Sequence, residues 1–213
     1  MNFEAAIFDL DGTLLDSMEV WKQIDHAFLT KRGLAVPPGY GEEIAAMSFR
    51  ETAEYTIARF GLSEQPEQVM QEWNEMAVAA YGKQVRLKPG AKEYLHKLKK
   101  QGVQLGICTA LSQKLYVPCL QNNGIYPLFD TYVSTDDVSC GKSKPDAWLL
   151  CAARLGATPQ NCMVFEDILP AIQSAKQAHM QICAVYDKYS QKDKPEILKL
   201  CDRYIHSFYE LLT

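Results

Sequence analysis

The chain has 213 residues, of which 47% are hydrophobic and 23% are charged, and its formal net charge is −4. This composition is typical of a globular protein with an ordinary hydrophobic core, and the length fits one large domain or a core with an insert. The acidic balance gives no electrostatic reason to expect nucleic acid or an anionic membrane as a partner.

The first predicted element is a buried strand at residues Glu4–Asp9. No basic segment precedes it, and no apolar stretch is long enough for a signal peptide or a transmembrane helix. The seven cysteines form no CxxC pair and several lie in apolar runs, which indicates reduced thiols and no disulfide or zinc framework. We therefore expect a cytoplasmic protein, either monomeric or dimeric.

Two acids, Asp9 and Asp11, end this strand and are followed by Gly12. A D-x-D pair alone also occurs in turns and in calcium-binding loops. The calcium loop is excluded because its sixth position would be Leu14 instead of glycine and its twelfth would be Val20 instead of glutamate. The preceding strand also argues against that motif, which needs a helix there.

The next seventy residues contain no convincing strand. Three helical patterns, each followed by a glycine, cover Ser17–Gly33, Ser48–Gly61 and Pro66–Gly82, and Ala35–Glu43 reads as a loop. The three tryptophans read as helix-packing residues. We expect a helical cap domain at residues 16–85, inserted after the first strand of a core formed by residues 1–15 and 86–213.

The remaining sequence alternates short apolar strands with amphipathic helices. This alternation predicts an α/β fold of the doubly wound, Rossmann-like type, with a parallel sheet covered on both faces. The expected strands are Val103–Thr109, Thr131–Thr135, Cys162–Asp167 and Gln181–Asp187, and the clearest helices are Pro89–Gly102, Asp146–Gly156 and Ile168–Met180.

Polar residues follow several of these strands, at the sheet edge where such folds place their sites. Carboxylates this close together need a cation, and an oxygen-only ligand set suits Mg²⁺. A nearby lysine and threonine would suit a phosphate group. Each residue also has a structural explanation, since threonine or an acidic pair can cap a helix and lysines are usually solvated. The residues are Asp9, Asp11, Thr109, Lys142, Lys144, Glu166 and Asp167.

The order of these features resembles the haloacid dehalogenase superfamily, in its branch of β-phosphoglucomutase-like and phosphoglycolate-phosphatase-like enzymes. The matching stretches are "FDLDGTLLDS", "LKPGAKEYLHKLKKQGVQLGICTA", "FDTYVSTDDVSCGKSKPDAWLLCAARLG" and "CMVFEDILPAIQSAKQAHM". They cover nearly all of the predicted core, in the order that the family has.

The resemblance implies roles for the residues at the first two strand ends. Asp9 would be the nucleophile that forms an aspartyl-phosphate. Asp11 would be the general acid and then the general base, with its backbone carbonyl on Mg²⁺. Thr109 and the amide of Ala110 would bind the phosphoryl oxygens.

The resemblance also assigns a lysine and the last two carboxylates. The family places its lysine four residues before the acid that begins the next helix, here Asp146, which selects Lys142 over Lys144. Glu166 and Asp167 would complete the metal site, with Asp167 as a direct ligand.

Substrate choice in the family is implied to reside in the cap. Arg50 is the candidate substrate contact there, and a solvated helix arginine is the alternative. The sequence departs from the family pattern at four positions, none of which removes a catalytic group: Ala110, Ile168, Ala171 and His179.

These features together predict Mg²⁺-dependent hydrolysis of a small phosphomonoester, such as a sugar phosphate, through an aspartyl-phosphate. A phosphomutase of the β-phosphoglucomutase type is the alternative enzyme. A non-catalytic relative or a receiver-like signalling module that accepts phosphate on aspartate is the alternative of another class.

Overall fold

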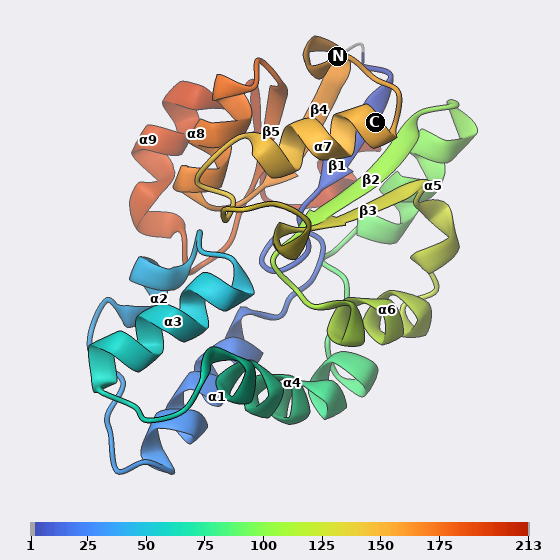
Figure 1. Ribbon diagram of the computed structural model, residues 1–213. Coiled ribbons are helices and arrows are strands. Elements are labelled where there is room, and N and C mark those ends of the chain that lie inside the picture. Colours follow the sequence, from blue (N-terminus) through green and yellow to red (C-terminus); the bar gives the residue numbers. More distant parts are fainter. Residues whose placement is uncertain (1–2, 213) are drawn as a thin grey trace.

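Six parallel strands form one sheet in the computed structural model, which describes residues 3–212 (Figure 1). The strand order is β3-β2-β1-β4-β5-β6, so the chain starts in the middle of the sheet and winds outward in both directions. This confirms the doubly wound α/β class. The strands are β1 (Ala5–Phe8), β2 (Gln104–Thr109), β3 (Thr131–Ser134), β4 (Cys162–Glu166), β5 (Gln181–Val185) and β6 (Arg203–Ile205).

Successive side chains of a strand point to opposite faces of the sheet, and both faces are buried. Ile7 belongs to one apolar cluster and Phe8 to the other, where its ring stacks on Phe165 at 4.3 Å between centroids. Each such buried side chain contributes about 1.5–3 kcal/mol. The Ile7 face is covered by α7 (Asp146–Arg154), α8 (Leu169–Gln177) and α9 (Lys194–Leu200), and the Phe8 face by α5 (Ala91–Lys100) and α6 (Gln113–Asn122).

Four further helices follow β1 and lie together at one end of the molecule (Figure 1). Their shared core includes Trp73, whose ring lies 5.3 Å from Phe28 and 5.6 Å from Phe49. The two segments that connect them to the sheet run side by side, since Asp16 N donates to Arg86 O at 2.9 Å. The helices are α1 (Met18–Thr30), α2 (Tyr40–Ile44), α3 (Phe49–Phe60) and α4 (Pro66–Lys83).

Two expectations about this helical segment are wrong. The expected loop Ala35–Glu43 contains the start of α2, a helix of little more than one turn that begins at Tyr40 after Gly39 in the left-handed region, at φ 83°. The expected stop at Gly82 is also wrong, because α4 continues to Lys83. Glycine weakens a helix by only about 1 kcal/mol relative to alanine, so a single glycine in the last turn does not have to end it.

Three elements of the core had no clear sequence signal. Helix α6 contains Pro118 in its interior, a residue that normally predicts a helix boundary. Helix α9 spans seven residues and β6 spans three, so neither shows a full hydrophobic period. Within residues 3–212, no helix combines the length and the apolar character needed to cross a bilayer.

Candidate active site

The parallel pairing of β1 and β4 brings two carboxylates to the same edge of the sheet. Phe8 pairs with Phe165, so Asp9 and Glu166 are the next residues on adjacent strands. Asp9 N donates to Phe165 O at 3.0 Å, which continues the ladder to the strand end. Together with Asp167, these residues form a buried carboxylate cluster in which one oxygen from each residue lies within 4.8 Å of the others.

Lys142 provides the positive charge at this cluster. Its ammonium donates to Asp9 Oδ1 and, at 3.0 Å, to Glu166 Oε2, and its side chain is only 5% exposed. The ring of Trp148 lies 5.0 Å from the ammonium, and Ser174 Oγ donates to the Lys142 carbonyl at 2.5 Å. The lysine is therefore held on both its main chain and its side chain.

The pKa values in the cluster follow from burial and from the imbalance of charge. Burial is the main cause that raises the pKa of Asp9 to about 7, and the charge of Lys142 opposes it. Burial, then Glu166 and Asp9, raise the pKa of Asp167 well above its usual value. Burial alone would lower the pKa of Lys142, but the charges of Asp9 and Glu166 outweigh it and the pKa is raised. The single ammonium of Lys142 therefore cannot neutralise the three carboxylates of the cluster.

Asp167 is held in place by the turn that follows β1. Thr13 Oγ1 donates to Asp167 Oδ1 at 2.9 Å. Gly12 lies in the left-handed region at φ 81°, and a Cβ atom there would come within 2.5 Å of Asp167 Oδ2. This position therefore requires glycine for two reasons: the backbone has a positive φ, and a Cβ atom would collide with Asp167. Glu166 is held by two backbone amides, from Asp167 at 2.9 Å and Ile168 at 3.2 Å.

The carboxylate cluster fits a magnesium ion. Its donors are carboxylate oxygens only, which hard divalent cations prefer. Burial and then neighbouring carboxylates raise the pKa values of Asp9 and Asp167, and a divalent cation would offset both effects. The missing Cβ of Gly12 leaves room beside Asp167.

The side chain of Asp11 lies outside the cluster and faces the helical segment. Its Oδ1 accepts from Ser17 Oγ and from Tyr81 OH, each at 2.5 Å, and its Oδ2 accepts from Trp21 Nε1 at 3.0 Å. Burial raises the pKa of Asp11, and these three hydrogen bonds oppose the shift. Asp9 and Asp11, two positions apart, therefore have different surroundings.

Thr109 and Ala110, the other predicted phosphate-binding residues near the cluster, lie at the end of β2. Thr109 ends β2 beside β1, is 1% exposed, and accepts from Leu111 N at 3.1 Å. Ala110 follows it at the same sheet edge. Lys144 is exposed to solvent, in contrast to Lys142. The two lysines of "GKSKPD" are thus clearly separated by burial.

Arg50 lies in the first turn of α3 and is not joined to the cluster by a described contact. Its guanidinium bonds Glu67 at 2.7 Å and lies 3.7 Å from Glu54, with half of its side chain exposed. Burial raises the pKa of Asp136, and the charge of Arg50 opposes this shift. Arg50 is thus a surface residue facing the segment after β3.

Several residues around the site carried no sequence signal for it. Trp21 reads as a packing residue, yet its indole bonds Asp11 as described above. Tyr81 lies 70 positions from Asp11, so no local pattern could connect them. Lys88 and Asp187 form a buried ion pair at 2.9 Å, and both act electrostatically on Asp167. Only the fold brings these residues to the sheet edge.

The helical segment contacts the core directly above the cluster. A Cβ atom on Gly141, next to Lys142, would lie 2.4 Å from Ala46 O and 2.6 Å from Ser48 N. Glu19 accepts hydrogen bonds from Lys188 at 3.2 Å and from Tyr189 at 2.6 Å, both in the loop after β5. The helices are therefore seated on the core, close to the residue that carries the ammonium.

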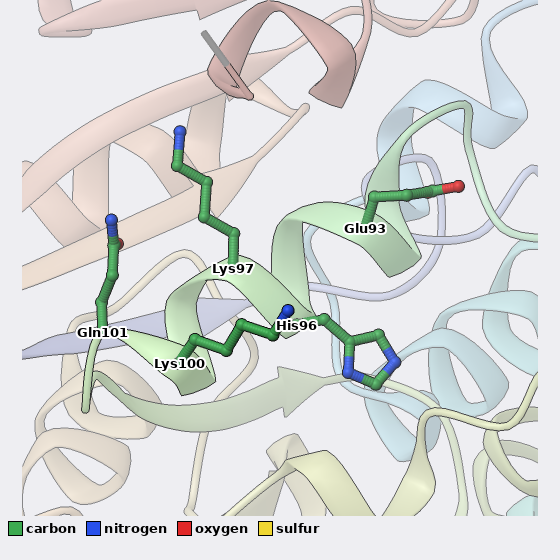
Figure 2. Close-up of a pocket in the computed structure, with 5 residues that line it drawn as sticks. All are labelled: Glu93, His96, Lys97, Lys100 and Gln101. Carbon is green, nitrogen blue, oxygen red and sulfur yellow. The ribbon is translucent and has the colours of Figure 1, made fainter.

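A surface hollow elsewhere on the molecule is unrelated to this site. Figure 2 shows its labelled side chains projecting from α5 and from Gln101, the residue that follows it. None of them belongs to the carboxylate cluster or bonds a member of it. The lining residues are Glu93, His96, Lys97, Lys100 and Gln101.

Comparison with known proteins shows that the chain is similar in sequence to phosphatases. It is 28% identical to hexitol phosphatase A of Escherichia coli, with 99% of this chain and 94% of that protein aligned. It is 27% identical to the putative phosphatase YhcW of Bacillus subtilis, over 87% of this chain and 84% of the relative.

Solved structures share the fold. CbbY from Rhodobacter sphaeroides, crystallised with phosphate, superposes with a TM-score of 0.86 at 23% identity, over 98% of this chain and 96% of that one. The β-phosphoglucomutase of Clostridium difficile gives 0.82 at 24% identity, over 98% and 93%. The sequence pattern of haloacid dehalogenase-like hydrolases matches residues 6–185, and the chain therefore belongs to that family.

Proposed function

We propose that this protein is a Mg²⁺-dependent phosphatase that hydrolyses a small phosphomonoester through an aspartyl-phosphate on Asp9. The observation that carries the proposal is the meeting of Asp9, Lys142, Glu166 and Asp167 at one buried sheet edge. The relatives named as phosphatases support the same reaction class.

The residues divide the work of the first step. Asp9 attacks the phosphorus, so that a bond forms between its carboxylate oxygen and phosphorus while the ester P–O bond breaks. Asp11 donates a proton to the departing oxygen, which leaves as an alcohol. Lys142 stabilises negative charge on the phosphoryl oxygens, and Thr109 and the amide of Ala110 bind these oxygens.

The second step reverses the role of Asp11. Its carboxylate accepts a proton from water, the water oxygen attacks phosphorus, and the bond to Asp9 breaks to release inorganic phosphate. Asp9, Glu166, Asp167 and the Asp11 carbonyl would hold Mg²⁺, which when bound offsets the charge repulsion between phosphate and Asp9. Asp11 can carry the proton because its side chain faces away from the cluster.

We further propose that residues 16–85 are a cap domain and that residues 1–15 and 86–213 are the core, although residues 1, 2 and 213 lie outside the described structure. The paired connections near Asp16 and Arg86 support this division. The seven cysteines are free thiols, which supports a reducing, cytoplasmic location. Arg50 remains a proposed substrate contact only if it exchanges Glu67 for a substrate anion.

The test is to trap the covalent intermediate. Asp11→Asn, mixed with Mg²⁺ and 4-nitrophenyl phosphate, should gain the mass of one phosphoryl group, because the activated ester needs no proton for its departure while hydrolysis lacks its base. Asp9→Asn is the matched control and should gain nothing. Phosphate trapped on the Asp9→Asn protein would contradict the assignment.

A phosphate-release assay over sugar phosphates, phosphoglycolate and nucleotides then separates the alternatives. A phosphatase releases inorganic phosphate from at least one ester, and excess chelator abolishes the release. A phosphomutase would instead return the phosphoryl group to the sugar, which chromatography of the products detects. A signalling module would become phosphorylated without turnover.

A further inference from the structure

Ser174 is a polar residue on the buried face of α8. The other buried residues of this helix are Ala171, Ile172 and Ala175, and like Ser174 they have no exposed surface. Serine is not favoured inside a helix, because its hydroxyl competes for backbone groups. A buried hydroxyl among apolar side chains is costly unless it has hydrogen-bond partners. The partners of Ser174 therefore indicate what the residue does.

Those partners form a chain of hydrogen bonds that ends at the backbone of Lys142. Trp148 Nε1, on α7, donates to Ser174 Oγ at 2.9 Å, and Ser174 Oγ donates to Lys142 O at 2.5 Å. The hydroxyl has a single proton, and its alternative acceptor, Ala171 O in the same helix, lies farther away at 2.9 Å. Within residues 3–212, no other described hydrogen bond reaches Lys142 O. Ser174 thus satisfies two buried groups at once, an indole N–H and a carbonyl.

The same contacts reach the other end of Lys142. The ring of Trp148 lies 5.0 Å from the ammonium, which donates to Glu166 Oε2 at 3.0 Å. Helix α8 begins at Leu169, directly after the carboxylates that end β4. Ser174 therefore connects the lysine to the same segment of chain whose carboxylates its ammonium must face.

The loop that carries Lys142 has few other anchors. Residues 139–144 form neither helix nor strand. The described backbone hydrogen bond within the loop, from Lys144 N to Gly141 O, is long at 3.4 Å. In the described part of the chain, the bond from Ser174 is the hydrogen bond that joins the backbone of this loop to the sheet-covering helices. Its loss would leave the loop free to shift.

We propose that Ser174 is a positioning residue for the ammonium that binds the phosphoryl group. Its hydroxyl, oriented by Trp148, holds the Lys142 carbonyl so that the side chain extends to the carboxylate cluster. This assignment rests on the proposed phosphatase function, in which Lys142 stabilises charge on the phosphoryl oxygens. A displacement of about 1 Å at such a group can lower the rate about 100-fold. Ser174 acts on the reaction through Lys142.

The kinetic test separates positioning from packing. Ser174→Ala should lower kcat by about 10–100-fold. The factor should be nearly the same for 4-nitrophenyl phosphate and for an unactivated ester, since the lysine acts on the phosphoryl group and not on the leaving group. Ile172→Val and Ile172→Ala, on the same buried face, are the matched controls. They should lower the urea concentration of unfolding to different extents, yet keep kcat within about twofold of the native value.

Two milder substitutions weaken one bond of the chain each. Ser174→Cys keeps a weak donor of similar size, and Trp148→Phe removes the indole N–H but keeps the bond from Ser174 to Lys142. Both should lose less kcat than Ser174→Ala. If Ser174→Ala does not fold, these two variants are compared with the Ile172 variants in its place.

A spectroscopic test observes the ammonium itself and needs no turnover. In protein with isotopically labelled lysine side chains, the ammonium groups of Lys142 and Lys88 should give nuclear magnetic resonance signals, because both are buried and hydrogen-bonded. Lys142→Met assigns one signal by its disappearance. Ser174→Ala should shift this signal, while the signal of Lys88, which is paired with Asp187 at 2.9 Å, should stay in place.

The assignment requires both a fall in kcat and a shift of the Lys142 signal, and either result without the other overturns it. It is also overturned if the Ile172 variants lose as much kcat at the same stability. A loss confined to the unactivated ester would place the effect on Asp11 instead of Lys142. If the native protein hydrolyses no ester, the proposed phosphatase function fails, and the signal alone then decides whether Ser174 places the ammonium.

Discussion

Replacing Lys142 by methionine should remove the only described cation that bonds the carboxylate cluster. Methionine keeps most of the volume of the side chain, so the change removes charge more than packing. At 3.0 Å from Glu166 Oε2, the ammonium attracts that carboxylate by about 5 kcal/mol at an effective dielectric constant of 20, before its desolvation is subtracted. Breaking a buried pair on one side costs about 3–5 kcal/mol, because a carboxylate remains buried without compensation.

The assay is urea unfolding in the presence of a chelator, followed by a titration with Mg²⁺. Lys142→Met should lose about 3–5 kcal/mol without metal. It should then gain more from Mg²⁺ than the native protein does, since the ion offsets the charge that the variant lacks. Turnover should fall by orders of magnitude even at saturating Mg²⁺.

Lys144→Met is the matched control, because Lys144 is exposed and two residues away. It should change the free energy of unfolding by less than about 0.5 kcal/mol and leave turnover nearly unchanged. If Lys144→Met were the more damaging substitution, or if Lys142→Met were as stable as the native protein in chelator, the assignment of the ammonium to the cluster would be refuted.

Three further changes test the metal site, the turn and the cap. Asp167→Asn should weaken Mg²⁺ binding, measured by titration calorimetry, and full turnover in excess chelator would argue against any metal role. Gly12→Ala should weaken Mg²⁺ binding because its Cβ displaces Asp167, whereas Gly33→Ala, also at positive φ but with open space around it, should cost only backbone strain of about 1–2 kcal/mol. Asp25→Asn should raise the free energy of unfolding by about 2 kcal/mol at pH 8. Burial raises the pKa of Asp25 from 3.8 to about 7, and the expected effect is half of what this shift would give for a fully buried group, because Asp25 is partly exposed. The native protein loses this stability as the pH rises through about 7, since the folded state prefers the protonated carboxyl, and the difference should vanish below pH 4, which urea unfolding across pH would show.

The sheet could be predicted because its strands are apolar runs that end in polar residues. Five of the six strands, including β1 and β4, appear where those runs predict them. The same periodicity fails where an element is too short to show it, as in β6 and α2, or where proline interrupts it, as in α6.

The candidate site shows the same limit at the level of side chains. Lys142 could be selected because its spacing from Asp146, the first residue of α7, is local information. The hydrogen bond from Tyr81 to Asp11 joins positions that only the packing of α4 near the sheet edge brings together. At position 179 the family usually has glycine, and the structure explains why: His179 has φ 60°, in the left-handed region that favours glycine.

The different surroundings of Asp9 and Asp11 explain how two carboxylates so close in sequence can have different chemistry. Asp9 continues β1 and lies beside Lys142, whose ammonium opposes the burial that raises the pKa of this carboxyl. Asp11 lies beyond it in the turn, and Ser17, Trp21 and Tyr81 hold its side chain toward the helices. Because Trp21 and Tyr81 belong to α1 and α4, the position of the proposed acid depends on how those helices sit on the core. The helical segment would then contribute to proton transfer as well as to substrate choice, which ties the recognition of a substrate to the chemistry performed on it.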